Sequence, residues 1–269
     1  MHAPGRPRAR RSWLPILCAA LAVAVVCALG VWRPWITPSA PVAAQDESLP
    51  VIAPAPLALP ENPRVLIFGD SWVYGSGADV PSNGFAYRLS ENLGWDTVVD
   101  GVRASGYLRA GLDGGSYVER VADLDPELDP DLIIVEGSIN DRLLHPNGYR
   151  DAVATVWDTL AALYPEATVV ILGPSPQVLP VEPGTAAIDK DLSRYAAARG
   201  WWYISPLAED WITEANYLSV IDTGPIGRDH PSTEGHAYLA TKVAEAVERM
   251  SEPADIVADA PLGAELPAR

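Results

Sequence analysis

Short apolar runs alternate with amphipathic stretches between residues 64 and 250, and this alternation limits the possible folds more than any other feature. Each run has the length of a buried strand and stops at a glycine or a polar residue, whereas the stretches repeat their apolar residues every three or four positions. The predicted strands are residues 65–68, 95–99, 132–135, 168–172 and 201–204. The predicted helices are residues 82–94, 149–164, 186–199 and 232–250. Strands that alternate with helices predict βαβ units, and therefore an α/β fold whose parallel sheet is covered on both faces.

Composition limits both the number of domains and the class of partner. The chain has 269 residues, 48% of them hydrophobic, which is enough for one full core and not for two. Its net charge of -16 argues against nucleic acid as a partner, because phosphate binding requires basic patches. Both cysteines, Cys18 and Cys27, precede the predicted globular part, which therefore has no thiol for a disulfide or a thiolate metal site.

The first 36 residues have the pattern of a membrane-targeting segment. Residues 1–11 carry arginines and no acidic residue, and residues 14–32 are almost wholly apolar, close to the ~20 residues that span a bilayer. A signal peptide usually has a shorter apolar region followed closely by its cleavage site, whereas the best candidate site here, Val42-Ala43-Ala44, lies well beyond the apolar region. We therefore expect an uncleaved signal-anchor with a cytoplasmic basic end and an extracytoplasmic remainder, or a secreted protein if the segment is cleaved.

Two further segments have compositions that are unsuited to a core. Residues 37–63 are rich in proline and alanine and predict an extended spacer between the membrane and the next domain. Residues 251–269 are rich in proline, alanine and acidic residues and predict a disordered tail. The globular domain is therefore expected to span residues 64–250.

Polar residues collect where the predicted strands end, and the carboxyl ends of parallel strands meet at one edge of a sheet, where ligands bind. Ser71 follows the first strand, Ala104-Ser105-Gly106 the second, and Asn140 the third. A serine at this edge can act as a nucleophile if the chain supplies a base and oxyanion donors. His230, just before the last predicted helix, is the candidate base. The alternative is that Ser71 only caps the segment that follows it.

Four short motifs in this order resemble those of the SGNH (GDSL-like) hydrolase family. They are Gly69-Asp70-Ser71, a glycine after the second strand, Gly137-x-x-Asn140-Asp141, and His230-Pro231-Ser232-x-x-Gly235-His236. The resemblance covers residues 64–250. It implies a three-layer α/β/α, flavodoxin-like fold with a central parallel sheet of about five strands. It also implies a serine esterase that uses no metal and no cofactor.

The resemblance also implies a role for individual residues. Ser71 is the expected nucleophile and His230 the expected base. The Ser71 amide and the Asn140 side chain are expected oxyanion donors. The donor from the second block is expected at Gly106, with Ala104 as a rival because the loop is about one residue short. Where the family has a leucine after its serine, Trp72 stands here, in a packing position that leaves the mechanism unchanged.

One departure concerns the residue that orients the base. The last block of the family is Asp-x-x-His, but Gly227 stands three residues before His230. A group that holds the imidazole in the correct tautomer is still required. Asp229 is our choice, while Asp222 or a backbone carbonyl are the alternatives.

The expected function is that of an exported, membrane-tethered serine esterase that cleaves O-acetyl or other O-acyl groups from small-molecule or glycan esters. Two alternatives remain. One is an O-acyltransferase at the same site, and the other is an inactive domain that binds envelope glycans, which the displaced aspartate favours. Of the other histidines, His236 is expected to pack or cap within the last helix, and His145 to lie in a loop. The sequence leaves the oligomeric state open.

Overall fold

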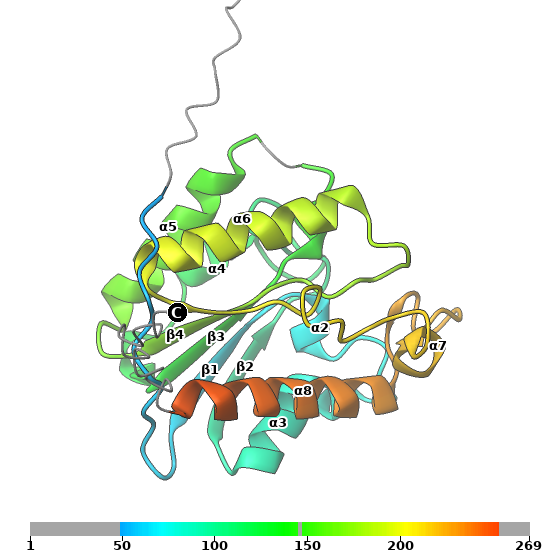
Figure 1. The fold of residues 1–269 in the computed structure, drawn as a ribbon, viewed down its shortest axis with the longest axis horizontal. Coiled ribbons are helices and arrows are strands. Elements are labelled where there is room, and N and C mark those ends of the chain that lie inside the picture. The colour runs from blue at the N-terminus through cyan, green and yellow to red at the C-terminus, as the bar shows by residue number, and fades with distance from the viewer. Residues whose placement is uncertain (1–48, 145–146, 253–269) are drawn as a thin grey trace, which may run out of the picture. The chain divides into compact units, whose positions relative to one another are not determined.

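A sheet of five parallel strands lies at the centre of the computed structural model, which describes residues 49–144 and 147–252 (Figure 1). The strand order is β2-β1-β3-β4-β5, which is the flavodoxin-like order. The strands are β1 (Arg64–Gly69), β2 (Asp96–Gly101), β3 (Leu132–Glu136), β4 (Thr168–Leu172) and β5 (Trp202–Ile204). The predicted parallel sheet of about five strands is therefore confirmed.

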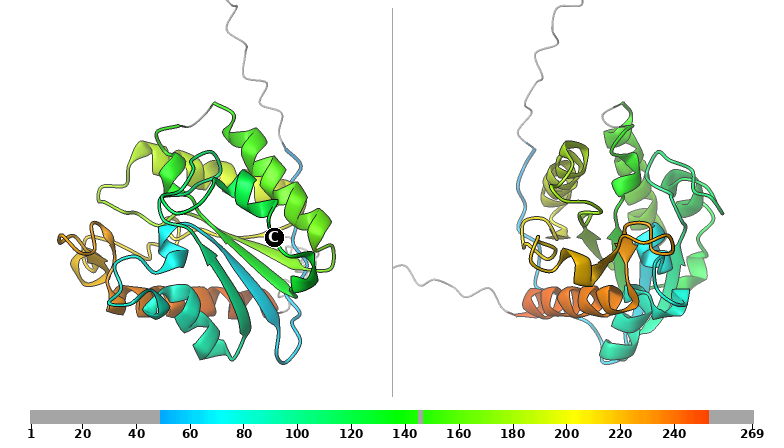
Figure 2. Two further views of the ribbon diagram at one scale, coloured as in Figure 1. Left: turned by 180° about the vertical axis from the view of Figure 1, so that it is seen from behind. Right: turned by 90° about the vertical axis from the view of Figure 1, so that its right-hand side faces the viewer.

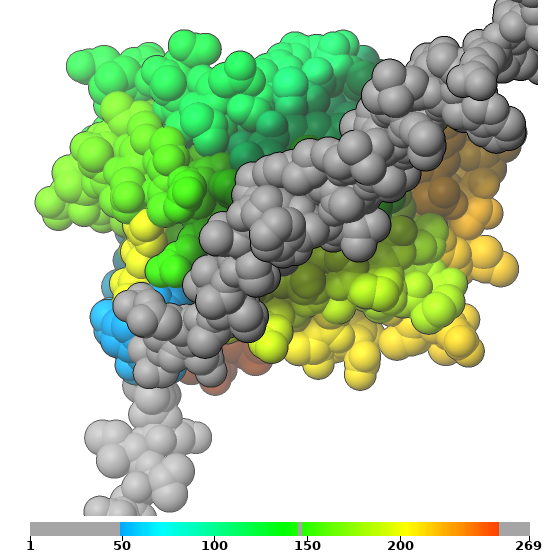
Figure 3. Space-filling model, turned by 90° about the horizontal axis from the view of Figure 1, so that it is seen from above, coloured from blue at the N-terminus to red at the C-terminus, as the bar shows by residue number. Residues whose placement is uncertain are grey.

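Helices cover both faces of this sheet, as predicted (Figures 1 and 2). One face carries α3 (Phe85–Leu93) and α8 (Thr233–Ser251). The other carries α4 (Tyr117–Val121), α5 (Tyr149–Leu163) and α6 (Pro183–Arg199), and Figure 3 views the molecule from the side of α5 and α6. The result is a three-layer α/β/α fold.

Shorter elements extend beyond the sheet. The helix α2 (Ser71–Tyr74) directly follows β1, and α7 (Tyr217–Val220) precedes the antiparallel pair β6 (Ile221–Asp222) and β7 (His230–Pro231). Single 3₁₀ turns are formed by Pro81–Asn83, Pro126–Leu128 and Ile139–Asp141. These short elements lie outside the long apolar patterns, so the pattern analysis did not predict them.

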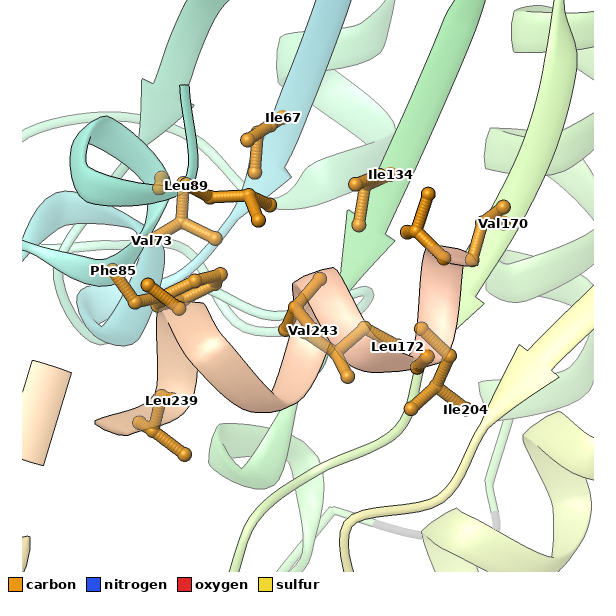
Figure 4. Packing of buried hydrophobic residues seen from close by; sticks show 14 of the residues in the cluster. Ile67, Val73, Phe85, Leu89, Ile134, Val170, Leu172, Ile204, Leu239 and Val243 are labelled. Carbon is orange, nitrogen blue, oxygen red and sulfur yellow. The ribbon is translucent and has the colours of Figure 1, made fainter. Parts of the chain in front are cut away.

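Strand residues alternate between two apolar cores, because successive side chains of a strand point to opposite faces. In β1, Ile67 packs on the side of α3 and α8, whereas Leu66 packs on the side of α4 to α6. Figure 4 shows the first core, with Val243 of α8 beside strand residues such as Ile134. Burial on both faces explains why these strands are continuous apolar runs rather than alternating ones.

Residues 49–60, which the sequence assigns to a spacer, have no regular structure but pack against the domain. The Ile52 N–H donates to the carbonyl of Ala197 in α6, and the Leu57 N–H donates to the carbonyl of Met250 in α8, at 2.9 and 2.8 Å. The Leu57 side chain is buried in the core. A segment rich in proline cannot form a core of its own, but a single leucine within it can contribute to the core of its neighbour.

Several predictions concern residues outside those that the structure describes. The expected anchor at 1–36, the first part of the spacer, residues 253–269 of the tail, and His145 belong to this group. Within residues 49–144 and 147–252, no helix is long and apolar enough to cross a bilayer. Over the same residues, no cluster of three or more His, Cys, Asp or Glu side chains has a geometry that could hold a metal ion.

Candidate active site

Ser71 is the first residue of α2 and lies immediately beyond the carboxyl end of β1. The preceding Asp70 caps this short helix, since its Oδ1 accepts a hydrogen bond of 2.8 Å from the Trp72 N–H. The Ser71 hydroxyl lies 2.9 Å from Nε2 of His230, which is 159 residues away in the chain. The fold therefore brings the predicted nucleophile and the predicted base into hydrogen-bonding contact.

The other ring nitrogen of His230 faces two backbone carbonyls. Nδ1 lies 2.9 Å from the oxygen of Gly227 and 3.0 Å from the oxygen of Arg228. Because a carbonyl oxygen can only accept a hydrogen bond, Nδ1 must carry the proton. The lone pair of Nε2 is then free to accept the proton of the Ser71 hydroxyl, which is the tautomer that a general base requires.

Asp229, the expected orienting residue, does not occupy that position in the structure. Among the described residues, its carboxylate makes no hydrogen bond to His230. Arg228 and Asp229 both have left-handed backbone conformations, with φ of 47° and 62°, which turn the chain just before the imidazole. Burial raises the pKa of the Tyr217 hydroxyl, and the negative charge of Asp229 raises it further. The carboxylate therefore acts electrostatically on Tyr217, and backbone carbonyls stand where the sequence analysis chose Asp229.

Asp222, the other carboxylate considered for this position, supports the loop instead. Its Oδ1 accepts from the Gly224 N–H at 2.7 Å and its Oδ2 accepts from the Gly227 N–H at 3.1 Å. These bonds hold the turn in which the Gly227 carbonyl faces His230. Asp222 therefore positions the base indirectly, through the backbone of the loop.

The expected oxyanion donors lie near Ser71, but they differ in their availability. The Ser71 N–H is the first of α2 and has no acceptor within the helix. The Gly106 N–H donates to the carbonyl of Arg109 at 2.8 Å and so is already engaged. Ala104 lines the cleft beside Ser71, with φ of 60°. The structure therefore favours Ala104 over Gly106 as the donor from this loop.

Asn140 also lines the cleft beside Ser71. Its Nδ2 donates to Oδ2 of Asp70 at 3.0 Å and to the carbonyl of Ser105 at 2.9 Å. Both hydrogens of the side-chain amide are thus engaged next to the nucleophile, so donation to an oxyanion requires the exchange of one of these bonds. Its role as an oxyanion donor stays a prediction.

Ser71, Ala104, Asn140 and His230 share an open cleft of about 510 Å³. Its walls come from the segment after β1, the loop after β2, and the loop that precedes β7. This edge of the sheet is the position at which open α/β sheets bind their ligands. A hydroxyl nucleophile, an imidazole base and backbone donors around such a cleft can carry out acyl transfer.

Comparison with known proteins agrees with this geometry. The family model for the GDSL-like lipase/acylhydrolase family matches residues 67–238. The chain belongs to this family. It is 26% identical over 193 residues to GDSL lipase Rv0518 of Mycobacterium tuberculosis, an alignment that covers 68% of this chain and 80% of the relative. Membership makes the protein an ester-hydrolysing serine hydrolase.

Solved structures show the same fold. The native aryl esterase of M. smegmatis superposes with a TM-score of 0.54 at 17% identity, covering 70% of this chain and 99% of that one. The carbohydrate acetylesterase Est24 of Sinorhizobium meliloti superposes with a TM-score of 0.53 at 16% identity, with the same coverage of 70% and 99%. The three-layer fold expected from the sequence is thus the fold of known GDSL-like hydrolases.

Beneath Ser71, the GDSL-like hydrolase holds two buried carboxyl groups, those of Asp70 and Glu136. Oδ2 of Asp70 accepts from the Ser138 hydroxyl and from the Asn140 amide, at 3.1 and 3.0 Å. Burial raises the pKa of Glu136 well above its usual range, and the negative charge of Asp70 raises it further. Burial raises the pKa of Asp70 as well, but the hydrogen bonds that it accepts from the Trp72 N–H and the Ser138 hydroxyl oppose this rise. Asp70 is therefore the hydrogen-bond acceptor of the buried pair.

Arg120 joins the loops of the hydrolase that carry the nucleophile and the expected donor. One guanidinium nitrogen donates to the carbonyl of Gly69 and to the hydroxyl of Ser105, both at 2.9 Å, and the other donates to Oδ1 of Asp100 at 2.8 Å. The guanidinium also stacks 4.2 Å from the ring centroid of Phe68. A buried cation thus fixes the ends of β1 and β2.

Asp141, the last residue of the third motif, binds the loop that follows β2. Its carboxylate accepts from the backbone N–H groups of Tyr107, Leu108 and Arg109, at 2.6, 3.2 and 3.0 Å. Burial raises the pKa of Asp141 to about 6, while these three donors oppose the rise. A Cβ at Gly106 would collide with this carboxylate, so glycine is required there for packing.

His236, expected to pack or cap, links α8 to the segment after the nucleophile. Its Nδ1 accepts from the Phe85 N–H at 3.1 Å and its Nε2 donates to the carbonyl of Ser76 at 3.0 Å. Burial lowers its pKa to about 4, so the ring is neutral at physiological pH. The role is structural, as the sequence predicted.

Sequence reasoning missed the supporting residues Arg120, Glu136 and Ser138. Glu136 ends an otherwise apolar strand just before a glycine, and a charge in that position was a usable signal. The capping box of Ser116 and Glu119 was a signal for α4, the helix that carries Arg120. No sequence signal pointed to Arg120 itself.

Proposed function

We propose that the chain is an exported, membrane-tethered serine esterase that removes O-acyl groups by way of an acyl-enzyme. The observation that carries this proposal is the contact of 2.9 Å between Ser71 Oγ and His230 Nε2 at the open cleft, with Nδ1 turned to two carbonyls. This geometry orients the base without a carboxylate. The family's ester hydrolysis supplies the reaction class.

In the first half of the reaction, Nε2 of His230 takes the hydroxyl proton while Ser71 Oγ attacks the ester carbonyl carbon. The developing oxyanion is stabilised by the N–H groups of Ser71 and Ala104 together with the Asn140 amide. Nε2 then returns the proton to the alcohol oxygen as that bond breaks, which leaves an ester between the acyl group and Ser71. Water, deprotonated by the same nitrogen, releases the acyl group as an acid and restores the hydroxyl.

The substrate class and the location rest on separate support. Among similar folds, one protein is an aryl esterase and another is a carbohydrate acetylesterase, so small aryl esters and acylated glycans are the candidates. Export and tethering rest on the basic and apolar sequence of residues 1–36. Fractionation of expressing cells, followed by protease treatment of intact cells, tests both. Recovery of the chain in the cytosol, protected from protease, would contradict them.

Hydrolysis of para-nitrophenyl acetate and octanoate by the purified full chain tests the reaction. We expect turnover that falls at least about 10⁴-fold in Ser71→Ala and in His230→Ala. The exposed Ser219 is the matched control, and Ser219→Ala should retain full activity. Turnover that survives Ser71→Ala would assign the nucleophile elsewhere. Absence of turnover on both esters, with product formed only when a sugar hydroxyl is added, would identify a transferase.

A further inference from the structure

The charge around the cleft is opposite in sign to that of the whole chain. Aspartate and glutamate outnumber lysine and arginine by 35 to 19. The described residues that line the cleft nevertheless include Arg103, Arg109 and Arg228 and no acidic residue. A concentration of positive charge at one cleft of an acidic protein produces a local field that attracts anions.

Only part of this charge is neutralised by the protein. Arg103 is paired with Asp113, whose Oδ2 accepts from its Nε at 2.7 Å. Arg109 and Arg228 are exposed, and neither forms an ion pair with a described residue. The cleft therefore presents two guanidinium groups with unused donors. Guanidinium groups match carboxylate, phosphate and sulfate oxygens in a planar, bidentate geometry.

The backbones of both arginines are fixed to the catalytic loops. The Arg109 N–H donates to the Asp141 carboxylate and the Arg109 carbonyl accepts from Gly106, which fixes it to the loop of the expected oxyanion donor. The Arg228 N–H donates to the carbonyl of Gly224 at 2.9 Å, and its own carbonyl faces Nδ1 of His230. The two charges thus belong to two different walls of the cleft that contains Ser71.

We propose that this cleft selects esters that carry an anionic group, which Arg109 and Arg228 bind while the ester carbonyl lies at Ser71. The proposal rests on the esterase function proposed above and adds the charge of the substrate. Arg228 lies two residues before the base, which protonates the leaving alcohol. Arg109 belongs to the wall that carries the expected oxyanion donor.

Equilibrium binding to the full chain carrying Ser71→Ala tests this selection without depending on turnover. The first pair of probes compares para-acetoxybenzoate with the neutral para-acetoxybenzamide. In this pair the carboxylate lies on the alcohol side of the ester. The second pair is mono-para-nitrophenyl glutarate against the neutral para-nitrophenyl valerate, with the charge on the acyl side. We expect at least about fivefold tighter binding of the anionic member in one or both pairs, decreasing as salt is raised.

Substitution assigns the effect to its residues. Arg109→Gln and Arg228→Gln should each reduce the ratio of anionic to neutral affinity by about threefold to fivefold. The matched control is Arg150→Gln, because Arg150 is exposed on α5 and does not line the cleft. The pair that responds shows whether the anion lies on the acyl or the alcohol side. Equal affinities within both pairs would overturn the proposal. So would a ratio of anionic to neutral affinity that falls equally in Arg150→Gln. Loss of hydrolysis alone would count only against the esterase function.

Discussion

Ser71 and His230 lie 2.9 Å apart, but different kinds of group position them. Buried side chains position the nucleophile, whereas backbone carbonyls of a partly exposed loop orient the base. On the nucleophile side, Asp70 and Arg120 are buried and hydrogen-bonded to several neighbours each. On the base side, the imidazole depends on the turn stabilised by Asp222. Substitutions of side chains should therefore lower activity more on the nucleophile side than on the base side.

The difference also has a chemical consequence. A carboxylate at Nδ1 both fixes the tautomer and stabilises the imidazolium that forms during the reaction. A carbonyl also fixes the tautomer, but it stabilises the imidazolium only through its dipole. Burial raises the pKa of Asp70 above its usual value, whereas the hydrogen bonds that it accepts and, least of all, the charge of His230 oppose the rise. The buried carboxyl group that interacts electrostatically with His230 thus lies on the nucleophile side.

Among the residues that support Ser71 and His230, the largest effect is expected at Asn140, on the nucleophile side. Asn140→Ala removes an expected oxyanion donor and should lower kcat by about 10²–10³-fold with little change in KM. The measurement is steady-state hydrolysis of para-nitrophenyl acetate, with thermal unfolding recorded in parallel. Asn92→Ala, at an exposed position of α3, is the control. A change in KM without a change in kcat would show that the amide only binds substrate.

A pH-dependent stability effect is expected at His236, which connects the two sides. Its pKa is lowered to about 4 in the folded chain from an ordinary value of 6.5, so the unfolded chain binds the proton more readily. The contribution of the neutral ring to stability is therefore complete above about pH 6.5 and lost as the pH falls towards 4, by on the order of 3 kcal/mol. Denaturant unfolding of wild type and His236→Gln across this range measures it. Parallel curves for the two proteins would contradict the assignment.

A smaller effect is expected at Asp222, on the base side. Asp222→Ala removes the acceptor of the Gly227 N–H and loosens the turn whose carbonyl orients His230. Misplacement of a catalytic group can cost up to about 10²-fold, and we expect a loss of about tenfold to 10²-fold in kcat. Asp222→Asn keeps one of the two acceptor oxygens that bind the Gly224 and Gly227 N–H groups, and should recover part of the activity. An unchanged kcat in Asp222→Ala would contradict the role of this turn.

The smallest effect is expected at Asp229. Because its carboxylate makes no hydrogen bond to His230 in the described structure, Asp229→Asn should change kcat by less than about threefold. A carboxylate that orients the imidazole would instead cost about 10⁴-fold on the same substitution. Hydrolysis of the same acetate ester distinguishes these outcomes clearly.

The sequence predicted the parts of the molecule that follow from periodicity and from strand ends. The buried strands, the helices on both faces and the neighbourhood of Ser71 and His230 belong to this group. The sequence did not predict which groups accept the hydrogen bond of His230 Nδ1, because that depends on left-handed conformations at both Arg228 and Asp229, and residues other than glycine rarely adopt them. It likewise could not choose between Gly106 and Ala104, since the choice depends on a hydrogen bond from Gly106 to Arg109 within a folded loop.

Labelling with a fluorophosphonate, followed by mass spectrometry of the digested full chain, tests most directly whether His230 activates Ser71. A phosphonate reacts with a serine only when a neighbouring base raises its nucleophilicity. We predict a single adduct on Ser71 in the wild type and in Asp229→Asn, and none in His230→Ala. An adduct on another residue, or equal labelling of Ser71 in His230→Ala, would contradict the account.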